Sequence, residues 1–399
     1  MRRVSIGAVG LTLVGLTCAA PVVGVSSAQA STRASAQVST AQVSTAQVST
    51  APRRVASGWI TYWRLDDGLA STLAHAALFR DVSLYWYSAT RRSTVVEQQP
   101  GSQPSLTVLN QAVTSLQAQG VPVFLTVNDQ GLGATSMARL LTDRQRRGRL
   151  IDNLVAKAQL SGADGIDIDF ESMNVGPNGA DRTTVKRVFP VFLGKLRQAL
   201  HSQSLSLSVA LPPRTSPRDG NWEVFDYGAI AANVDRARVM TYDFSTMAGR
   251  PGPIAPITWV DSVARFASAH FGRRLSLGLP TYGYNWFVKR LSGSCPRVAT
   301  APTYGSTRSL VDLAASHHVT PGYVRSVAGY TYSYRRWFSS GTRSCRVERT
   351  VWYEDARSVW AKLAVLRRHG FGTVALWSIG GERKGTWTVL RHYAATPGP

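Results

Sequence analysis

Acidic residues are scarce in this 399-residue chain, which has 23 Asp and Glu against 45 Lys and Arg and a formal net charge of +22. Lysine is scarcer still, because only six of the basic residues are lysine. A basic excess favours anionic partners such as acidic glycans, wall polymers or nucleic acid. The arginines are scattered, however, and no nucleic-acid-binding motif occurs, so we expect no nucleic-acid partner. Charge alone does not define the function.

Long apolar runs are missing beyond the first residues of the chain. Arg2 and Arg3 precede an apolar run over 4–25, and a small-x-small site follows at Ala28-Gln29-Ala30. This order predicts a secretory signal peptide over 1–30, and therefore export without a membrane span. Residues 31–55 repeat AQVST three times with nothing large to bury, which predicts a disordered linker or wall spacer. The remaining residues, 56–399, are long enough for one large domain.

Cysteine is also scarce. Removal of a signal peptide would take Cys18 with it and leave Cys295 and Cys345. Two cysteines in an exported protein predict one disulfide, and two buried free thiols are the alternative. The seven histidines show no zinc-binding spacing, and no nucleotide-binding glycine fingerprint follows the first strand. We therefore expect neither a metal ion nor a cofactor.

What the chain does contain is a regular alternation of strand-like and helix-like segments. Helical patterns separate short apolar runs, and they cover 106–119, 146–160, 185–200, 257–271 and 354–369. The predicted strands are 59–63, 82–87, 121–127, 165–170, 205–211, 237–242, 275–279 and 372–377. Alternating strands and helices imply right-handed βαβ units, and eight such units close a (β/α)8 TIM barrel. The alternative is a doubly wound open sheet.

One connection is too long for a barrel loop. The segment 285–352, after the seventh strand, has its own helical and strand-like patterns and a Ser-Gly turn near Gly341. It predicts a small α+β insertion with a hairpin, and a disulfide between Cys295 and Cys345 would lie within it. Its aromatic residues suggest one wall of a groove above the barrel, although a packed decorative subdomain is the alternative.

The scarce acids concentrate in the fourth strand, where four of them fall within ADGIDIDFES, residues 163–172. Alternate residues of a strand share a face, so Asp167, Asp169 and Glu171 point into the barrel. Asp164 has the opposite parity and is predicted to be a structural hydrogen-bond acceptor. Glu171 ends the row, at the carboxyl end of the strand, where barrel active sites collect.

Carboxylates stacked in a barrel interior cannot all ionise. Repulsion and desolvation raise their pKa values, so we expect the row to hold a shared proton. Protonated Glu171 would be a general acid for a leaving oxygen. A metal site is the rival interpretation of clustered acids, but such sites usually draw ligands from several elements and loops.

The run DGIDIDFE resembles the DxxDxDxE signature of glycoside hydrolase family 18, the chitinase family. Three further matches lie at later strand ends, at 240–243 (MTYD), 279–284 (LPTYGY) and Trp377. The resemblance covers about 58–393. The third strand departs from it, because 124–128 read FLTVN where many chitinases have Ser-x-Gly-Gly. The runs YGYNW and VWYEDARS look more like the spore-cortex and cell-wall branch of the family.

The resemblance implies substrate-assisted retention, in which Glu171 is the acid and the sugar's acetamido group is the nucleophile. It implies that Asp169 binds the acetamido N–H, that Asp167 holds the shared proton and that Tyr242 donates to the acetamido oxygen. The other residues that it assigns to substrate binding are Asp243, Trp377, Met240 and Tyr282. Asn128, at the end of the third strand, is a further candidate for contact with substrate.

We therefore expect a secreted, monomeric β-N-acetylglucosaminidase or chitinase-type hydrolase. Its expected partner is an N-acetylglucosamine-containing polysaccharide, with electrostatic association with an anionic cell wall as a second expectation. Two alternatives stay open: a lectin with the same barrel, and an endoglycosidase that acts on protein N-glycans. The sequence leaves chitin, peptidoglycan and N-glycan substrates open, as well as endo or exo action.

Overall fold

A computed structural model describes residues 53–176 and 179–398. The predicted signal peptide, 1–30, and all but the last three residues of the predicted linker, 31–55, lie outside the described residues. Val55 is buried, and its backbone N–H donates to the carbonyl oxygen of Leu78 at 2.8 Å. The packed domain therefore includes Val55, one residue before the predicted boundary.

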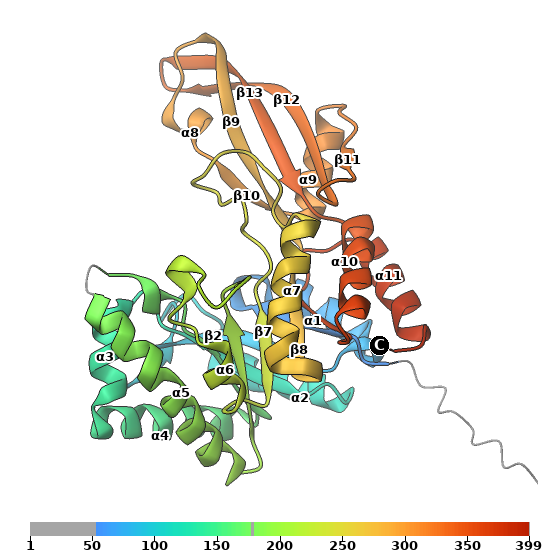
Figure 1. Ribbon diagram of the computed structural model, residues 1–399. Coiled ribbons are helices and arrows are strands. Elements are labelled where there is room, and N and C mark those ends of the chain that lie inside the picture. The colour runs from blue at the N-terminus through green and yellow to red at the C-terminus, as the bar shows by residue number, and fades with distance from the viewer. Residues whose placement is uncertain (1–52, 177–178, 399) are drawn as a thin grey trace, which may run out of the picture. The chain divides into compact units, whose positions relative to one another are not determined.

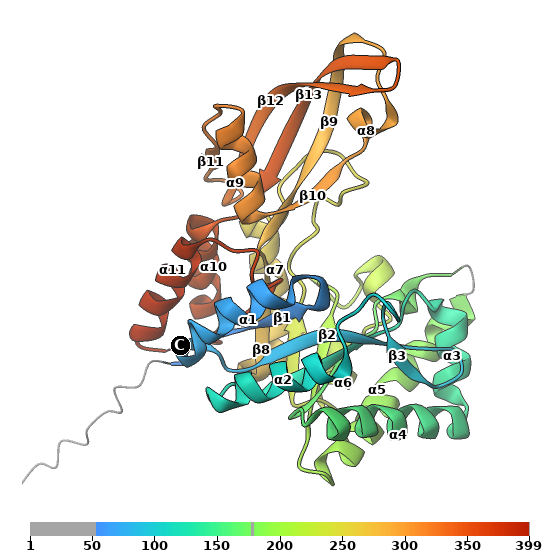
Figure 2. The ribbon, with the colours of Figure 1, turned by 180° about the vertical axis from the view of Figure 1, so that it is seen from behind.

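Eight parallel strands form a closed barrel (Figures 1 and 2). Their order around the ring is β1-β14-β8-β7-β6-β5-β4-β2, and β1 pairs with both β14 and β2. A short ninth strand, β3 (Val95–Glu97), adds to β2 in the antiparallel sense. The barrel strands are β1 (Ala56–Thr61), β2 (Val82–Ala89), β4 (Val123–Asn128), β5 (Gly165–Asp169), β6 (Ser206–Leu211), β7 (Arg236–Val239), β8 (Leu275–Pro280) and β14 (Thr373–Trp377). The predicted (β/α)8 TIM barrel is confirmed.

Helices follow the strands and cover the outside of the barrel. The five predicted helices are present as α2 (Leu106–Ala118), α4 (Arg144–Ser161), α5 (Gly179–His201), α7 (Ile257–Phe271) and α10 (Ala356–Arg368). Four further helices of the barrel were not predicted: α1 (Leu65–Leu73), α3 (Gly133–Thr142), α6 (Tyr227–Ala231) and α11 (Lys384–Ala395). A glycine in the first turn weakens the helical pattern of α1, α3 and α11, and α6 has five residues. Single 3₁₀ turns lie at Tyr62–Arg64, Ala76–Leu78, Ser172–Asn174, Gly220–Trp222 and Gly272–Arg274.

Side-chain polarity sets the ends and faces of these elements. The Asp143 carboxylate caps α4 by accepting from the backbone N–H groups of Gln145 and Arg146, and Gly162 ends the helix with a φ of 69°. On β5, Ile166 and Ile168 are fully buried in the core between strands and helices. No helix among the described residues is long and apolar enough to cross a membrane.

The insertion after β8 is a five-stranded antiparallel sheet with the order β10-β9-β13-β12-β11. It stands above the carboxyl ends of the barrel strands (Figure 1) and is slightly wider than the predicted 285–352. Its elements are β9 (Tyr282–Gly293), α8 (Arg297–Thr300), β10 (Thr303–Ser306), α9 (Thr307–Ser316), β11 (Gly322–Val324), β12 (Gly329–Ser340) and β13 (Arg343–Tyr353). The predicted hairpin joins β12 to β13 around Gly341, whose φ is 55°. A disulfide joins Cys295 to Cys345, so both predicted cysteines lie within the insertion and are bonded to each other.

Candidate active site

The acid row lies on β5 and just beyond its end. Asp167 and Asp169 are buried inside the barrel, and Glu171 follows the strand at the start of a 3₁₀ turn. Asp164 precedes the strand, where its carboxylate accepts from the Val123 backbone N–H at 2.7 Å and from Gln117 Nε2 at 2.9 Å. Asp164 thus connects β5 to its neighbours at the opposite end of the barrel, as a structural acceptor.

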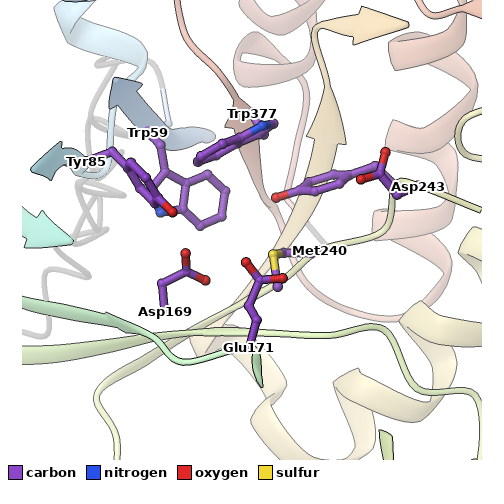
Figure 3. A pocket seen from close by; sticks show the side chains of 8 residues that line it. Trp59, Tyr85, Asp169, Glu171, Met240, Asp243 and Trp377 are labelled. Atoms are coloured by element: carbon purple, nitrogen blue, oxygen red, sulfur yellow. The ribbon is translucent and has the colours of Figure 1, made fainter. Parts of the chain in front are cut away.

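A cavity of about 150 Å³ opens at the carboxyl ends of the strands, above the acid row. In Figure 3 the carboxyl groups of Asp169 and Glu171 point into the same space, which Trp59 and Trp377 bound on the other side. Five different strands or their ends supply the lining, so the closed barrel is what brings these side chains together. The lining residues are Trp59, Tyr85, Asp169, Glu171, Met240, Tyr242, Asp243 and Trp377.

A second cavity, of about 420 Å³, adjoins the first. The two share Glu171, Met240, Tyr242 and Asp243, so the Glu171 carboxyl lies where they meet. The additional walls of the second cavity are Pro212, Pro213, Trp222, Phe244, Thr246 and Trp259. An extended ligand that fills both cavities would therefore pass over Glu171.

Glu171 is set up to carry a proton near neutral pH. Its carboxyl is exposed to the cavity, but the surrounding walls exclude enough water that burial raises its pKa to about 7, with further contributions from the charges of Asp129 and Asp243. Asp129 itself is buried and accepts from the backbone N–H of Ser172 at 3.0 Å and from its Oγ at 2.6 Å. This anchor places a fixed negative charge close to Glu171.

Asp169 lies deeper than Glu171. Burial raises the pKa of Asp169 well above its ordinary value, and the charges of Glu171, Asp167 and Asp129 raise it further. A hydrogen bond with Tyr85 opposes part of this shift. The carboxyl of Asp169 thus favours its protonated form, as expected for a row of acids that shares protons.

Asp167 pairs with a buried arginine from another barrel strand. Arg238, on β7, extends through the barrel interior and places Nη1 3.0 Å from Asp167 Oδ2, and both side chains are almost completely buried. The same carboxylate oxygen accepts from Trp59 Nε1 and Thr126 Oγ1, each at 2.9 Å. Asp167 is the lowest carboxylate of the row, and its Oδ2 therefore has three donors, one of which is the positively charged guanidinium of Arg238.

A second acid holds the other end of the guanidinium. Arg238 Nη2 lies 2.5 Å from Asp81 Oδ1, and Arg236 Nη1 lies 2.6 Å from Asp81 Oδ2. Burial alone would lower the pKa of Arg238, but the charges of Asp167 and Asp81 raise it above its ordinary value. Beneath the site thus runs a chain of alternating charges, from the partly exposed Arg236 through the buried Asp81 and Arg238 to Asp167.

Tyr242 and Asp243 also line the cavity, next to Glu171. Burial and the nearby charges of Glu171 and Asp169 raise the pKa of Tyr242 well above its ordinary value, so its hydroxyl keeps a proton to donate. Asp243 has a φ of 58° and accepts from the hydroxyls of Tyr282 and Tyr284, the latter at 2.7 Å. Met240 also lines the cavity, whereas Tyr282 lies behind Asp243 as its hydrogen-bond donor.

Aromatic rings make up the remainder of the cavity. The Trp377 ring centroid is 5.6 Å from that of Trp59 and 5.1 Å from that of Tyr85, in edge-to-face contacts. Asn128 does not line the cavity. Its Nδ2 donates to the Tyr85 hydroxyl at 2.8 Å, and its Oδ1 accepts from Ser88 Oγ at 2.6 Å. Asn128 therefore positions Tyr85 in the structure.

Among the residues around the acid row, Trp59, Tyr85, Asp129 and Arg238 were not identified from the sequence. Each of them lies in or next to a predicted strand, and the residue type at each position could have marked it as a site candidate. Trp59 and Tyr85 are aromatic residues in the first two strands, and Asp129 is an acid directly after the third strand. Arg238 is a charged residue in the apolar run of the sixth strand, which is a strong indication of a buried ion pair. Within residues 53–176 and 179–398, no three His, Cys, Asp or Glu side chains are grouped to hold a metal ion.

Comparison with known proteins identifies the family of this chain. The model of the family "Glycosyl hydrolases family 18" matches residues 72–382. The cortical fragment-lytic enzyme of Bacillus subtilis is 25% identical over 307 residues, which make up 76% of this chain and 65% of that protein. The chain thus spans slightly less than two thirds of this relative.

Solved structures show the same fold. A chitinase from Chromobacterium violaceum superposes with a TM-score of 0.70 and 23% identity, and the match covers 86% of this chain and all of that one. The spore cortex-lytic enzyme SleL of Bacillus cereus superposes with a TM-score of 0.69 and 23% identity, covering 86% of this chain and 74% of that one.

Proposed function

Because this chain belongs to glycosyl hydrolase family 18 and is a glycosidase, we propose that it is an exported hydrolase that cleaves β-1,4 bonds of N-acetylglucosamine polymers with retention of configuration. The observation that carries the proposal is the place of Glu171. Its carboxyl has a pKa near 7 and lies where two adjoining cavities meet. A bond between two sugars that occupy the two cavities would lie next to this proton.

The reaction follows from the groups around that proton. Glu171 protonates the glycosidic oxygen, and the sugar's own 2-acetamido oxygen attacks the anomeric carbon to give an oxazolinium ion. The Glu171 carboxylate then takes a proton from water, which opens the oxazolinium with retained configuration. An intramolecular nucleophile can lower the barrier by about 7–11 kcal/mol in favourable cases, so no second carboxylate is needed as nucleophile.

Asp169 links the acetamido group to the acid. In its protonated form its carbonyl oxygen accepts the acetamido N–H, and its hydroxyl donates to the Glu171 carboxylate once that group has lost its proton. The resemblance to the family assigned the shared proton to Asp167. The ion pair with Arg238 favours a different division, in which Asp167 is the fixed anion and the protons of the row reside on Asp169 and Glu171. The anion at Asp167 then stabilises the positive charge of the oxazolinium from below.

The remaining walls position the sugar. Tyr242 donates its hydroxyl to the acetamido oxygen, Asp243 accepts from a sugar hydroxyl, and Trp377 packs against the apolar face of the ring. Asn128 acts through Tyr85 in this scheme, and Tyr282 acts through Asp243. The second cavity, with its tryptophans and prolines, takes the sugar on the leaving-group side.

The names of relatives narrow the substrate class. A cortical fragment-lytic enzyme and a chitinase are both similar to this chain, so peptidoglycan-type and chitin-type polymers are the proposed substrates. Export by the predicted signal peptide would bring the enzyme to such polymers. A lectin with the same barrel is the second candidate, but the presence of the acid at Glu171 favours catalysis.

One series of digestions tests this function. The secreted domain is incubated with chitin oligosaccharides, peptidoglycan, an N-glycosylated protein and deacetylated chitin, and new reducing ends are identified by mass spectrometry. Glu171→Gln should lower kcat by about 10²–10⁴-fold, whereas Glu97→Gln, an acid outside the cavity, should leave it unchanged. Cleavage of deacetylated chitin as fast as chitin would reject the acetamido nucleophile, and cleavage of none of the substrates would favour the lectin.

A further inference from the structure

The insertion carries more net positive charge than its share of the chain, because it has few acidic residues. Between Tyr282 and Tyr353 there are ten basic residues and two acidic ones, Asp312 and Glu348. Several of the basic residues lie on the distal parts of β9, β12 and β13, which extend away from the barrel (Figure 1). The basic residues are Lys289, Arg290, Arg297, Arg308, Arg325, Arg335, Arg336, Arg343, Arg346 and Arg349.

The two faces of this sheet differ. Residues that pair directly across antiparallel strands share a face of the sheet, and Phe338 pairs with Cys345. We call the face that carries these two residues the covered face. That face packs against Ala299 of α8 in a small core with Val347 and Phe287. The covered face therefore has a structural role, and its cystine fastens the segment that contains α8.

The other face is open at its distal end. Trp337 pairs directly with Arg346, and Arg335 pairs with Glu348, which in turn pairs with Lys289. Trp337 is 58% exposed, and among the described residues it belongs to no hydrophobic cluster and contacts no other ring. Arg335, Arg346 and Lys289 are also exposed, and the contact between Arg335 and Glu348 is long, at 3.5 Å. We call these four residues, Lys289, Arg335, Trp337 and Arg346, the distal face.

The same face continues down to the catalytic cavity. On β13 Trp352 has the same parity as Arg346, and it pairs with Tyr284, whose hydroxyl donates to Asp243. Six residues of strand separate Arg346 from Trp352, which is a distance of about 20 Å. A polymer held at the distal face is therefore within reach of the active site along the same strand.

We propose that the distal face binds an acidic glycan strand of the polymer on which the enzyme acts, an inference that rests on the proposed function. The Trp337 ring packs on the apolar face of a sugar, and the Arg335 and Arg346 guanidinium groups pair with phosphate groups attached to the same strand. An acidic glycan fits the distal face because the exposed Trp337 ring has Arg335 on its own strand and Arg346 directly opposite. A neutral glycan would need no arginines. Binding at this site retains the enzyme on an anionic wall between cleavage events.

Binding can be measured without cleavage in a full-length Glu171→Gln background. The probes are insoluble peptidoglycan that retains its attached phosphate polymers, the same material after acid removal of those polymers, and insoluble chitin. The test variant is Arg335→Ser with Arg346→Ser. The matched control is Arg336→Ser with Arg343→Ser, which removes the same charge from the same hairpin at positions of the opposite parity.

We expect the test variant to bind the intact anionic wall about tenfold more weakly than the control variant, with Trp337→Ala weaker by about fivefold. The difference should shrink above ~0.5 M salt, where the Debye length falls well below 10 Å, and should vanish on chitin and on the stripped wall. Equal losses in both double variants would overturn the proposal, because net charge alone would then explain binding. Equally tight binding of a single-stranded DNA oligonucleotide at the distal face would overturn it as well.

A separate measurement keeps this proposal distinct from the proposed function. With Glu171 intact, the distal-face variants should hydrolyse a short soluble chitin oligosaccharide at the wild-type rate, because that substrate does not reach the distal face. A loss of this hydrolysis in the distal-face variants would overturn the proposal, since the substitutions would then act through the catalytic site. Absence of hydrolysis in the wild-type chain, with selective wall binding retained, would overturn only the proposed function.

Discussion

Replacement of Arg238 by methionine tests whether the buried charges beneath the acid row are a coupled unit. Methionine keeps much of the side-chain volume but removes the guanidinium that pairs with Asp167, while Asp81 retains Arg236. Both members of the lost pair are almost completely buried, and removal of one partner from such a pair costs about 3–5 kcal/mol. That loss is a large fraction of the ~5–15 kcal/mol stability of an ordinary domain.

The assay is urea unfolding followed by tryptophan fluorescence, with the free energy of unfolding extrapolated to water. Arg236→Met is the matched control, because Arg236 pairs with Asp81 but does not contact Asp167. Its side chain is 22% exposed, so we expect a smaller loss of about 1 kcal/mol. The double variant Arg238→Met with Asp167→Asn should recover about 2 kcal/mol of the stability lost in the single variant, because no unpaired charge stays buried. A stability loss no larger than that of the Arg236 variant, or no recovery by Asp167→Asn, would refute the coupled-charge argument.

Three further predictions concern other buried groups. Hydrolysis should decline as the pH rises through about 7, where Glu171 loses its proton. Asp129→Asn should move this alkaline limb of the pH profile of kcat to lower pH, because it removes a charge that raises the pKa of Glu171. An alkaline limb that does not move would contradict this assignment. Lys362→Met should destabilise the domain by about 3–5 kcal/mol, because it leaves the Glu354 carboxylate buried without its cation. The added substitution Glu354→Leu should restore most of this stability, as measured by urea unfolding. Equal stability of the single and double variants would argue against a buried ion pair. Replacement of both cysteines of the insertion by alanine should lower stability by up to about 4 kcal/mol, as expected for a disulfide across 50 residues, and calorimetry of the two forms would measure it; identical unfolding temperatures would show that the insertion needs no cross-link.

The sequence by itself was sufficient for the fold class and for the acid row. Strand-length apolar runs that alternate with helical patterns predict a barrel, because each pattern follows from which faces of an element must be buried. The parity of β5 likewise gives the orientation of Asp167, Asp169 and Glu171, since it depends only on the two-residue repeat of a strand. The same local logic identified the insertion, the hairpin around Gly341 and the cysteine pair.

The partners of those side chains were decided by the tertiary structure. Arg238 is 71 residues from Asp167 in the sequence, and only closure of the barrel places its guanidinium against that carboxylate. Asn128 and Tyr282 illustrate the same limit. Asn128 ends β4 and Tyr282 follows the end of β8, but they contact Tyr85 and Asp243 rather than the cavity. Periodicity along a chain reports which face of an element is buried, whereas the partner that a buried polar group finds depends on contacts between distant elements.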